Sequence, residues 1–352
     1  MTGLLHRTAP PWRRLGLVAG LAAGGCSTPA TDFVAPTSLT AESSGEAGGD
    51  TGDGGNGDDD AESSSGADDE ASTGGDGTTG DDPPPPGEYA MCPEPLPEGW
   101  VLCEDFEALQ DPASAFFEYQ DGEGAFVLDD GGGASGRRSM RVTYRPGVEG
   151  AGYLSAAFGR NPIVFGDVPQ ASTDSDFQSV YWRLRVKTQA GWPGIGPGHL
   201  TSATSFASPM WNQAMNARLR SDGDNVVLLG EPTTCVQGDQ VACSGYEDPD
   251  GPKGLGGLVG ATPLFAAKNA DRWFCVEAHV ALNSPGSSDG VFEFWVDGEL
   301  QNGVYDLDWR GSWTDYGINL ITIENLWPGG APSQLERSID DFVISTEPIG
   351  CE

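Results

Sequence analysis

The feature that most constrains the fold of this chain is a succession of short segments in which apolar and polar residues alternate. Clusters of Gly, Pro, Asn and Asp separate these segments and favour turns between them. No segment of 12 or more residues carries the apolar stripe of a helix. The sequence therefore predicts an all-β fold, a two-sheet antiparallel sandwich of the jelly-roll type. The expected strands cover 136–144, 179–187, 211–220, 226–229, 273–282, 291–296, 318–323 and 341–345.

The chain begins like an exported protein. Arg7, Arg13 and Arg14 precede a short apolar run over 15–25, which is typical of a secretory signal. This run is shorter than the ~18 residues that a membrane-spanning helix needs. The sequence Ala23-Gly-Gly-Cys26 resembles the lipobox of bacterial lipoproteins, in which the cysteine is lipidated and becomes the mature N-terminus. The resemblance implies a signal peptide over 1–25 and lipidation at Cys26; the alternative is an ordinary cleaved signal with an unmodified cysteine.

Residues 26–89 are rich in Gly, Ser, Asp and Pro, with 16 acidic residues between positions 27 and 88. Such a segment cannot bury enough apolar surface to offset its chain entropy, and like charges extend it. We expect a disordered tether that holds the folded domain, 90–352, away from a membrane. Ser27 after the cysteine fits sorting to the outer membrane. The predicted location is therefore exported and lipid-anchored to the bacterial outer membrane, with the domain facing the periplasm or the cell exterior.

The charge balance excludes one class of partner. The chain has 18 Lys and Arg against 53 Asp and Glu, a formal net charge of -35. A general nucleic-acid binder needs a positive field to replace the counterions of phosphate, and this chain offers none. We expect no nucleic-acid partner, and we expect a monomer.

Six cysteines follow Cys26, and an even number in an exported domain predicts disulfides. Close spacing favours Cys92–Cys103 and Cys235–Cys243, which leaves Cys275–Cys351. The first and last strands are expected to be neighbours, so exchange among Cys92, Cys103 and Cys351 stays open. A zinc site is the alternative, but paired Cys-x-x-Cys spacing is absent.

Several strand motifs resemble the concanavalin A-like lectin and glucanase superfamily, in its polysaccharide-lyase-like branch. The motifs lie at 103–107, 136–142, 180–187, 273–298 and 340–345. The resemblance spans most of 100–349 and implies a jelly roll that handles carbohydrate. Extracellular domains of this fold often hold calcium near the last strand, so the resemblance also implies a structural calcium at Asp340.

Strand alternation predicts which side chains oppose the apolar core. On the expected strands these are polar, basic or aromatic. If the strands are neighbours, they form a locally basic groove lined by tryptophan; the alternative is an ordinary solvated sheet face. Indole rings stack on sugars, Asn and Glu bond to hydroxyls, and Arg and Lys bind carboxylates of anionic sugars. The expected ligand-binding residues are Arg185, Lys187, Asn216, Arg218, Glu277, His279 and Trp295.

We therefore expect a cell-envelope lipoprotein that binds extracellular, anionic polysaccharide. A polysaccharide lyase that cleaves uronate-containing glycans by β-elimination is the first alternative. It needs a base, for which His199, Tyr181 or His279 are candidates, and a group such as Arg183 that neutralises the uronate carboxyl. His199 is expected in a loop after the basic strand. A structural or adhesive envelope protein without a sugar site is the second alternative.

A laminarinase-type hydrolase is disfavoured. It needs paired carboxylates on one strand, usually as Glu-x-Asp-x-x-Glu, and the sequence has no such pattern. Whether the domain is an enzyme is thus left open by the motifs, and no cofactor other than calcium is indicated.

Overall fold

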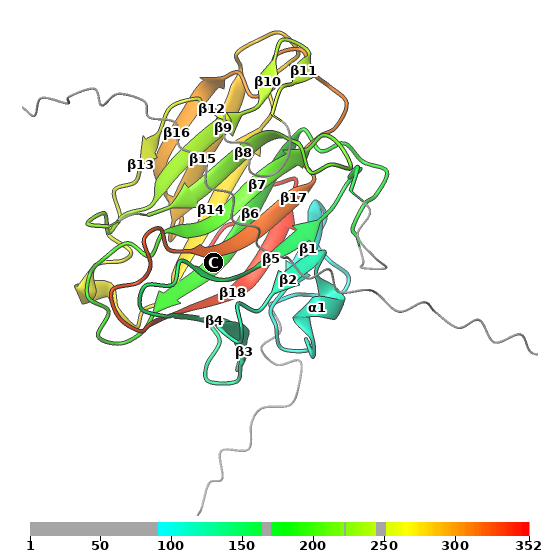
Figure 1. The fold of residues 1–352 in the computed structure, drawn as a ribbon. Helices are drawn as coiled ribbons and strands as arrows, with labels where there is room; N and C mark the ends of the chain where they lie inside the picture. The colour runs from blue at the N-terminus through cyan, green and yellow to red at the C-terminus, as the bar shows by residue number, and fades with distance from the viewer. Residues whose placement is uncertain (1–90, 164–169, 222, 244–250, 352) are drawn as a thin grey trace, which may run out of the picture. The chain divides into compact units, whose positions relative to one another are not determined.

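The computed structural model describes residues 91–163, 170–221, 223–243 and 251–351. The expected signal peptide, the lipidation site Cys26 and the acidic tether lie outside the described residues. Within them, regular secondary structure consists almost entirely of two large antiparallel sheets, as Figure 1 shows, so the predicted all-β sandwich is confirmed.

No helix among the described residues is long and apolar enough to cross a membrane.

The first sheet, which we call sheet A, has eight strands in the order β16-β15-β14-β6-β18-β4-β3, with β1 also paired to β18. Its centre is β6, which pairs with β14 on one side and with β18 on the other. The strands are β1 (Trp100–Glu104), β3 (Phe126–Asp129), β4 (Ser139–Tyr144), β6 (Ser179–Thr188), β14 (Phe274–Ala281), β15 (Gly290–Val296), β16 (Glu299–Leu307) and β18 (Leu335–Ser345).

The second sheet, sheet B, has the order β12-β9-β8-β7-β17-β5-β2, with β13 also paired to β9. Its strands are β2 (Glu118–Gln120), β5 (Gly150–Ala157), β7 (His199–Phe206), β8 (Gln213–Arg220), β9 (Leu229–Thr234), β12 (Lys253–Gly254), β13 (Leu258–Val259) and β17 (Leu320–Leu326). A small hairpin of β10 (Val236–Gln237) and β11 (Gln240–Val241), the helix α1 (Pro112–Ala115) and the 3-10 turn η1 (Ala267–Asn269) complete the described elements.

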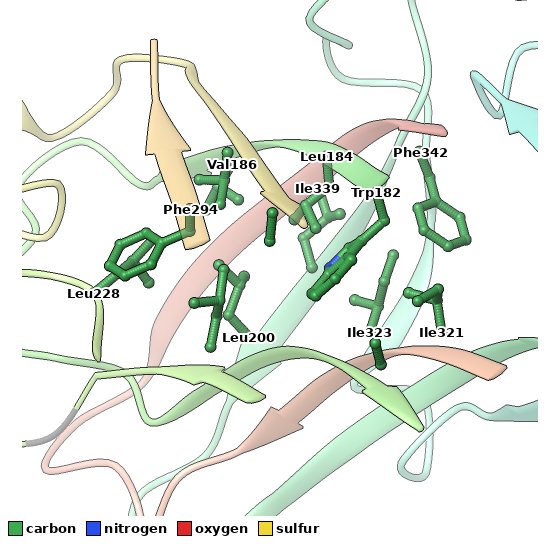
Figure 2. Close-up of a cluster of buried hydrophobic side chains, with 14 of the residues drawn as sticks. Trp182, Leu184, Val186, Leu200, Leu228, Phe294, Ile321, Ile323, Ile339 and Phe342 are labelled. Atoms are coloured by element: carbon green, nitrogen blue, oxygen red, sulfur yellow. The ribbon is translucent and has the colours of Figure 1, made fainter. Parts of the chain in front are cut away.

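The core lies between the two sheets and follows the period of two in the sequence. Trp182, Leu184 and Val186 of β6 point inward from sheet A, and Ile321 and Ile323 of β17 point inward from sheet B (Figure 2). All five are at most 1% exposed. Each such buried side chain contributes about 1.5–3 kcal/mol relative to an exposed one. The side chains that alternate with these core residues point outward, those of sheet A onto one outer face and those of sheet B onto the other.

The structure corrects several strand predictions. His199 opens β7 rather than lying in a loop. The strand expected over 211–220 begins at Gln213, because Trp211 adopts a positive φ of 64° in the preceding turn. The strand expected at 341–345 is the second half of the longer β18. The strands β5 and β7 were not expected, because small Gly, Ala, Ser and Thr residues weaken their alternation.

Three disulfides form among the described residues: Cys92–Cys103 and Cys235–Cys243, the pairs that close spacing favours, and Cys275–Cys351, the pair that these two leave. The first joins the start of the domain to β1, and the third joins β14 to the end of the chain. The disulfide prediction is confirmed.

Candidate functional site

The expected site residues fall into two groups on opposite sides of the sandwich. The strands β6, β14 and β15 belong to sheet A, whereas β7 and β8 belong to sheet B (Figure 1). The site residues alternate with the core residues of these strands, so both groups point away from the shared core. The expectation of one common groove is therefore wrong. Sheet A carries Tyr181, Arg183, Arg185, Lys187, Glu277, His279 and Trp295; sheet B carries His199, Asn216 and Arg218.

On the outer face of sheet A, the C-terminal tail forms hydrogen bonds with two of the expected site residues. Arg183 donates from Nη1 to the carbonyl oxygen of Gly350 at 2.9 Å, and Glu277 accepts hydrogen bonds from the backbone N–H groups of Ile349 and Gly350. Burial beneath the tail lowers the pKa of Arg183, which is 3% exposed. The side chains of Arg183 and Glu277 are thus already hydrogen-bonded within the protein.

The aromatic residues of this face also bind one another. The rings of Tyr181 and His279 stack in parallel with centroids 4.0 Å apart. His279 contacts Glu293 through Nδ1 and Ser179 through Nε2, each at 2.9 Å. Burial lowers the pKa of His279 despite the opposing effect of Glu293. Both ring nitrogens and one ring face of His279 are therefore engaged within the protein. Trp295 lies next to Tyr181, with ring centroids 6.4 Å apart.

The remaining cations of sheet A are paired as well. Arg185 lies 2.9 Å from the buried carboxyl of Asp341. Lys187 lies over the ring of Trp273, 5.0 Å from its centroid, and 3.8 Å from Asp271. The basic row that the sequence indicates is real, but its charges are matched by acidic or aromatic partners.

The outer face of sheet B carries a different arrangement. A row of mostly small polar side chains crosses five neighbouring strands at consecutive register positions. A short apolar cluster that includes Phe117, Phe206 and Leu320 packs at one end of this face. Several members of the polar row are almost fully buried although they face away from the main core. The row consists of Ser155, Thr322, Ser202, Arg218 and Glu231, with Thr204 and Asn216 beside it.

Beside this row, four side chains form a charged cluster, which we call the His199 cluster: His199, Ser202, Arg218 and Glu324. One carboxyl oxygen of Glu324 lies 2.8 Å from Nδ1 of His199 and 3.2 Å from Nε of Arg218. The other oxygen accepts a hydrogen bond from the hydroxyl of Ser202. Burial alone would raise the pKa of Glu324, but Arg218, and then His199 and Ser202, outweigh it and lower the pKa to about 2. Glu324 is therefore a carboxylate at neutral pH.

The Glu324 carboxylate determines which tautomer the His199 imidazole adopts. A hydrogen bond from Nδ1 to a carboxylate fixes the tautomer and leaves a lone pair on Nε2. Nε2 of His199 contacts no donor or acceptor among the residues that the structure describes. The His199 side chain is 15% exposed, so it is partly open to solvent. A histidine held in this way can accept a proton at Nε2.

A tyrosine lies on the other side of Glu324. Tyr153 of β5 pairs in register with Glu324 of β17, so it lies two strands away from His199 of β7. Its hydroxyl lies 3.5 Å from a carboxyl oxygen of Glu118. Burial, and then the charge of Glu118, raise the pKa of Tyr153, so the phenol keeps its proton at neutral pH. Tyr153 is thus a protonated phenol on the same outer face as His199, two strands away from it.

Asn216, the third expected residue of sheet B, and Arg220 flank the His199 cluster. Asn216 donates from Nδ2 to the hydroxyl of Thr204 at 2.9 Å. Arg220, the register partner of His199, forms an ion pair of 2.6 Å with Glu231. Of the three residues expected on this sheet, His199 and Arg218 meet at one carboxylate, and Asn216 lies two positions along the same strand as Arg218.

Two members of this surface, Glu324 and Tyr153, were missed in the sequence. The expected strand 318–323 stops one residue before Glu324, although Leu320, Thr322 and Glu324 continue its outward alternation. Tyr153 stands among Gly, Ala and Ser residues that hide the pattern of β5. Following the alternation of β17 for one more residue would have placed Glu324 on the polar face.

Asp340, the expected calcium ligand, is fully buried on β18. Its carboxyl accepts hydrogen bonds from the backbone N–H groups of Ala134 and Asp341. Burial, and then the neighbouring charge of Asp341, raise the pKa of Asp340 to about 8. The described residues hold no group of three or more His, Cys, Asp and Glu side chains able to bind a metal ion. Calcium at Asp340 stays a prediction.

Comparison with known proteins finds similarity in structure only. No protein-family model and no curated protein matches the chain. The PL-14 alginate lyase of Aplysia kurodai is 16% identical over 70% of this chain and 99% of its own, with a TM-score of 0.46. The endo-β-1,4-glucuronan lyase of Trichoderma reesei is 12% identical over 70% and 96%, with a TM-score of 0.45.

An alginate lyase from Chlorella virus is also similar, at 14% identity over 66% of this chain and all of its own, with a TM-score of 0.41. The resemblance to polysaccharide lyases that the strand motifs indicated is thus found again among solved structures. What those enzymes cleave is a property of those enzymes, so the function of this chain has to be inferred from its own side chains.

Proposed function

We propose that this protein is a polysaccharide lyase that cleaves uronate-containing glycans on the outer face of sheet B. The observation that carries the proposal is the His199 cluster, with Tyr153 on the same face as the register partner of Glu324. A proton acceptor, a proton donor and a partly exposed guanidinium lie on β7, β5 and β8, and Glu324 lies on β17 between β7 and β5. Lyase chemistry requires these three functions on one surface.

The proposed reaction is a β-elimination. Nε2 of His199 removes the proton from the carbon next to the uronate carboxyl, and the electron pair forms a carbon–carbon double bond. The glycosidic carbon–oxygen bond breaks, and the Tyr153 hydroxyl protonates the leaving oxygen. Arg218, whose side chain is 31% exposed, neutralises the charge that builds up on the uronate carboxyl. Glu324 holds the imidazole and stabilises its protonated form.

The elimination creates an unsaturated uronate that absorbs near 230–235 nm, which makes a direct assay available. We expect the full chain to raise this absorbance on uronate polymers. His199→Gln and Tyr153→Phe should each lower kcat by about 100-fold or more, because general acid–base catalysis contributes at least this much.

The opposite face of the sandwich supplies matched controls for these variants. His279→Gln and Tyr181→Phe change the same residue types on sheet A, and they should leave kcat within about twofold. Equal losses in the sheet A pair, or none in the sheet B pair, would reject the assignment to sheet B.

Glycan binding without turnover is the second candidate, and the partly exposed side chains of Arg218 and Glu231, 31% and 34% exposed on the outer face of sheet B, favour it. A guanidinium binds the carboxylate of a uronate, and a carboxylate accepts hydrogen bonds from sugar hydroxyl groups. If the full chain binds uronate polymers in a pull-down but yields no absorbance change, binding is the function. If it neither binds nor cleaves, the structural or adhesive alternative takes its place.

We also propose that the domain is anchored through Cys26 and carried by the acidic tether outside the cytoplasm. The three disulfides support export, because such bonds persist in oxidising compartments. Labelling with a radioactive fatty acid in a Gram-negative bacterial host tests the anchor. Wild-type chain should carry label and Cys26→Ala should not; label on both would place the lipid elsewhere.

A further inference from the structure

A fully buried arginine lies in the core behind the His199 cluster. Arg337 belongs to β18 of sheet A, yet its guanidinium reaches the backbone of sheet B. Nη1 and Nη2 both lie 3.1 Å from the carbonyl oxygen of His199, and Nη2 lies 2.9 Å from that of Glu324. A buried charge is costly unless it is hydrogen-bonded or paired. No ion pair joins Arg337 to a carboxylate in the part of the chain that the structure describes, so these carbonyl groups are its compensation.

An asparagine extends this contact to a third strand. Oδ1 of Asn325 accepts a hydrogen bond of 2.6 Å from Arg337, and its Nδ2 donates to the carbonyl oxygen of Gly152 at 3.0 Å. Gly152 directly precedes Tyr153. One guanidinium and one amide therefore hold, from the core side, the backbone of three strands that carry His199, Glu324 and Tyr153 on the outer side.

These contacts occur where the ladders of sheet B are irregular. The register between β7 and β8 shifts between His199 and Thr201, and the register between β17 and β5 shifts between Glu324 and Leu326. A bulge takes backbone groups out of the ladder and redirects the side chains next to it. A carbonyl group left unpaired in the core would be destabilising. Arg337 and Asn325 supply the missing donors and so permit the irregular backbone.

We propose that Arg337 is a positioning residue: from inside the core it fixes the bulged backbone that brings Nδ1 of His199 to the carboxylate of Glu324. Arg337 lies on the core side of sheet B and does not touch substrate. Its effect on catalysis rests on the proposed lyase function, whereas its effect on the His199–Glu324 hydrogen bond does not.

The test is the proton on Nδ1 of His199, observed by NMR in the full chain labelled with ¹⁵N-histidine. A proton held in a hydrogen bond to a carboxylate is shifted downfield and exchanges slowly with solvent. Arg337→Lys keeps a positive charge but cannot bond both carbonyl groups and Asn325 in the same planar geometry. We expect the signal to disappear, or its exchange with solvent to accelerate by about tenfold or more.

Ile339→Ala is the matched control, because Ile339 is a fully buried core residue of the same strand. It should lower thermal stability and leave the His199 signal in place. Asn325→Ala is the second variant if Arg337→Lys does not fold; it should weaken the signal in the same direction. An unchanged signal in the folded Arg337 and Asn325 variants, or an equal loss in Ile339→Ala, would overturn the proposal.

Kinetics separates this proposal from the proposed function. If the wild-type chain cleaves a uronate polymer, Arg337→Lys should lower kcat by about tenfold with KM within about twofold, since a misplaced base affects the chemical step. If the wild-type chain cleaves no polymer and Arg337→Lys still loses the His199 signal, the lyase function is rejected and the positioning role stands. If the wild-type chain cleaves the polymer and Arg337→Lys has the same kcat and the same His199 signal as the wild type, the positioning role is rejected.

Discussion

Arg218 and His199 share one carboxyl oxygen of Glu324, at 3.2 Å from Nε and 2.8 Å from Nδ1 respectively. The three side chains come from β8, β7 and β17, which are adjacent in sheet B. A carboxylate between two cationic or proton-donating partners stays ionised although it is buried, because both partners favour its charged form. The charge of Glu324 thus contributes both to the electrostatics of the outer face of sheet B and to the stability of the fold.

The first prediction concerns Glu324→Gln. The pKa of Glu324 in the folded protein is about 2, below the ordinary 4.5, so its charge stabilises the folded state above pH 4.5 and this contribution is lost as the pH falls to about 2. Glu324→Gln should lower the free energy of unfolding by about 1–3 kcal/mol at pH 7, with the difference vanishing near pH 2. Urea unfolding at pH 7, 5, 3 and 2 measures it.

Glu336→Gln is the control for this prediction. Glu336 forms an ion pair of 3.0 Å with Arg141, and its side chain is 36% exposed. Such exposed pairs contribute little, so this variant should differ from wild type by about 0.5 kcal/mol or less. If Glu324→Gln lowers the free energy of unfolding equally from pH 7 to pH 2, the loss comes from the shape of the side chain and not from its charge.

The fold could be predicted from the sequence because burial follows the alternation of each strand. Val180, Trp182 and Leu184 point inward as expected, since a period of two leaves only one face for apolar side chains. Spacing favoured Cys92–Cys103 and Cys235–Cys243, because each closes a short loop, but the exchange of partners with Cys351 was decided only by the structure.

The site could be predicted only in part. Alternation shows that Arg183 and Arg218 both point away from the core, but it does not show to which sheet each strand belongs. That depends on the order β14-β6-β18 in one sheet and β8-β7-β17 in the other, which is set by long-range pairing. Arg337 gave no signal either, because a cation on an apolar strand face has meaning only once the carbonyl groups opposite it are known.

The second prediction concerns the disulfide Cys275–Cys351. It closes a separation of 76 residues and holds the tail over Arg183 and Glu277. The double change Cys275→Ser with Cys351→Ser should lower the free energy of unfolding by about 2–4 kcal/mol, because the unfolded chain gains entropy and two buried charges lose partners. Thermal unfolding and proteolysis of the tail measure it.

The disulfide Cys235–Cys243 provides the control, since it spans only 8 residues. Removing Cys235–Cys243 should lower the free energy of unfolding by about 2 kcal/mol less than removing Cys275–Cys351, because the entropy that the unfolded chain gains grows with the length of the closed loop. A difference of about 2 kcal/mol would mean that the tail contributes nothing through its contacts with sheet A, a larger difference would measure that contribution, and equal losses would contradict the chain-entropy description.

The third prediction concerns Asp340. Its pKa of about 8 lies above the ordinary 3.8, so its contribution to stability is present below about pH 4 and is lost as the pH rises through about 8. The free energy of unfolding of the wild type should fall between pH 5 and pH 9 by about 1 kcal/mol or more beyond any fall in Asp340→Asn. Urea unfolding at pH 5, 7 and 9 in EDTA measures this slope; parallel curves would contradict it.

Calcium adds a second arm to the same experiment. An ion at Asp340 would favour the charged carboxyl and so raise stability most at high pH. We expect added calcium to raise the unfolding temperature of the wild type at pH 8 and to leave Asp340→Asn unchanged. A rise in both would place calcium elsewhere, and no rise in either would end the prediction of a structural calcium.

The fourth prediction concerns Gly152, whose carbonyl group receives the hydrogen bond from Asn325. Its φ is +91°, and an added Cβ would lie 2.4 Å from the carbonyl oxygen of Gln120 on β2. Gly152→Ala should therefore lower the free energy of unfolding by about 2 kcal/mol or more, because backbone atoms have to move. Gly150→Ala is the control, since a Cβ there meets nothing within 4 Å. Chemical denaturation of both variants measures the difference, and equal stabilities would show that β2 yields without strain.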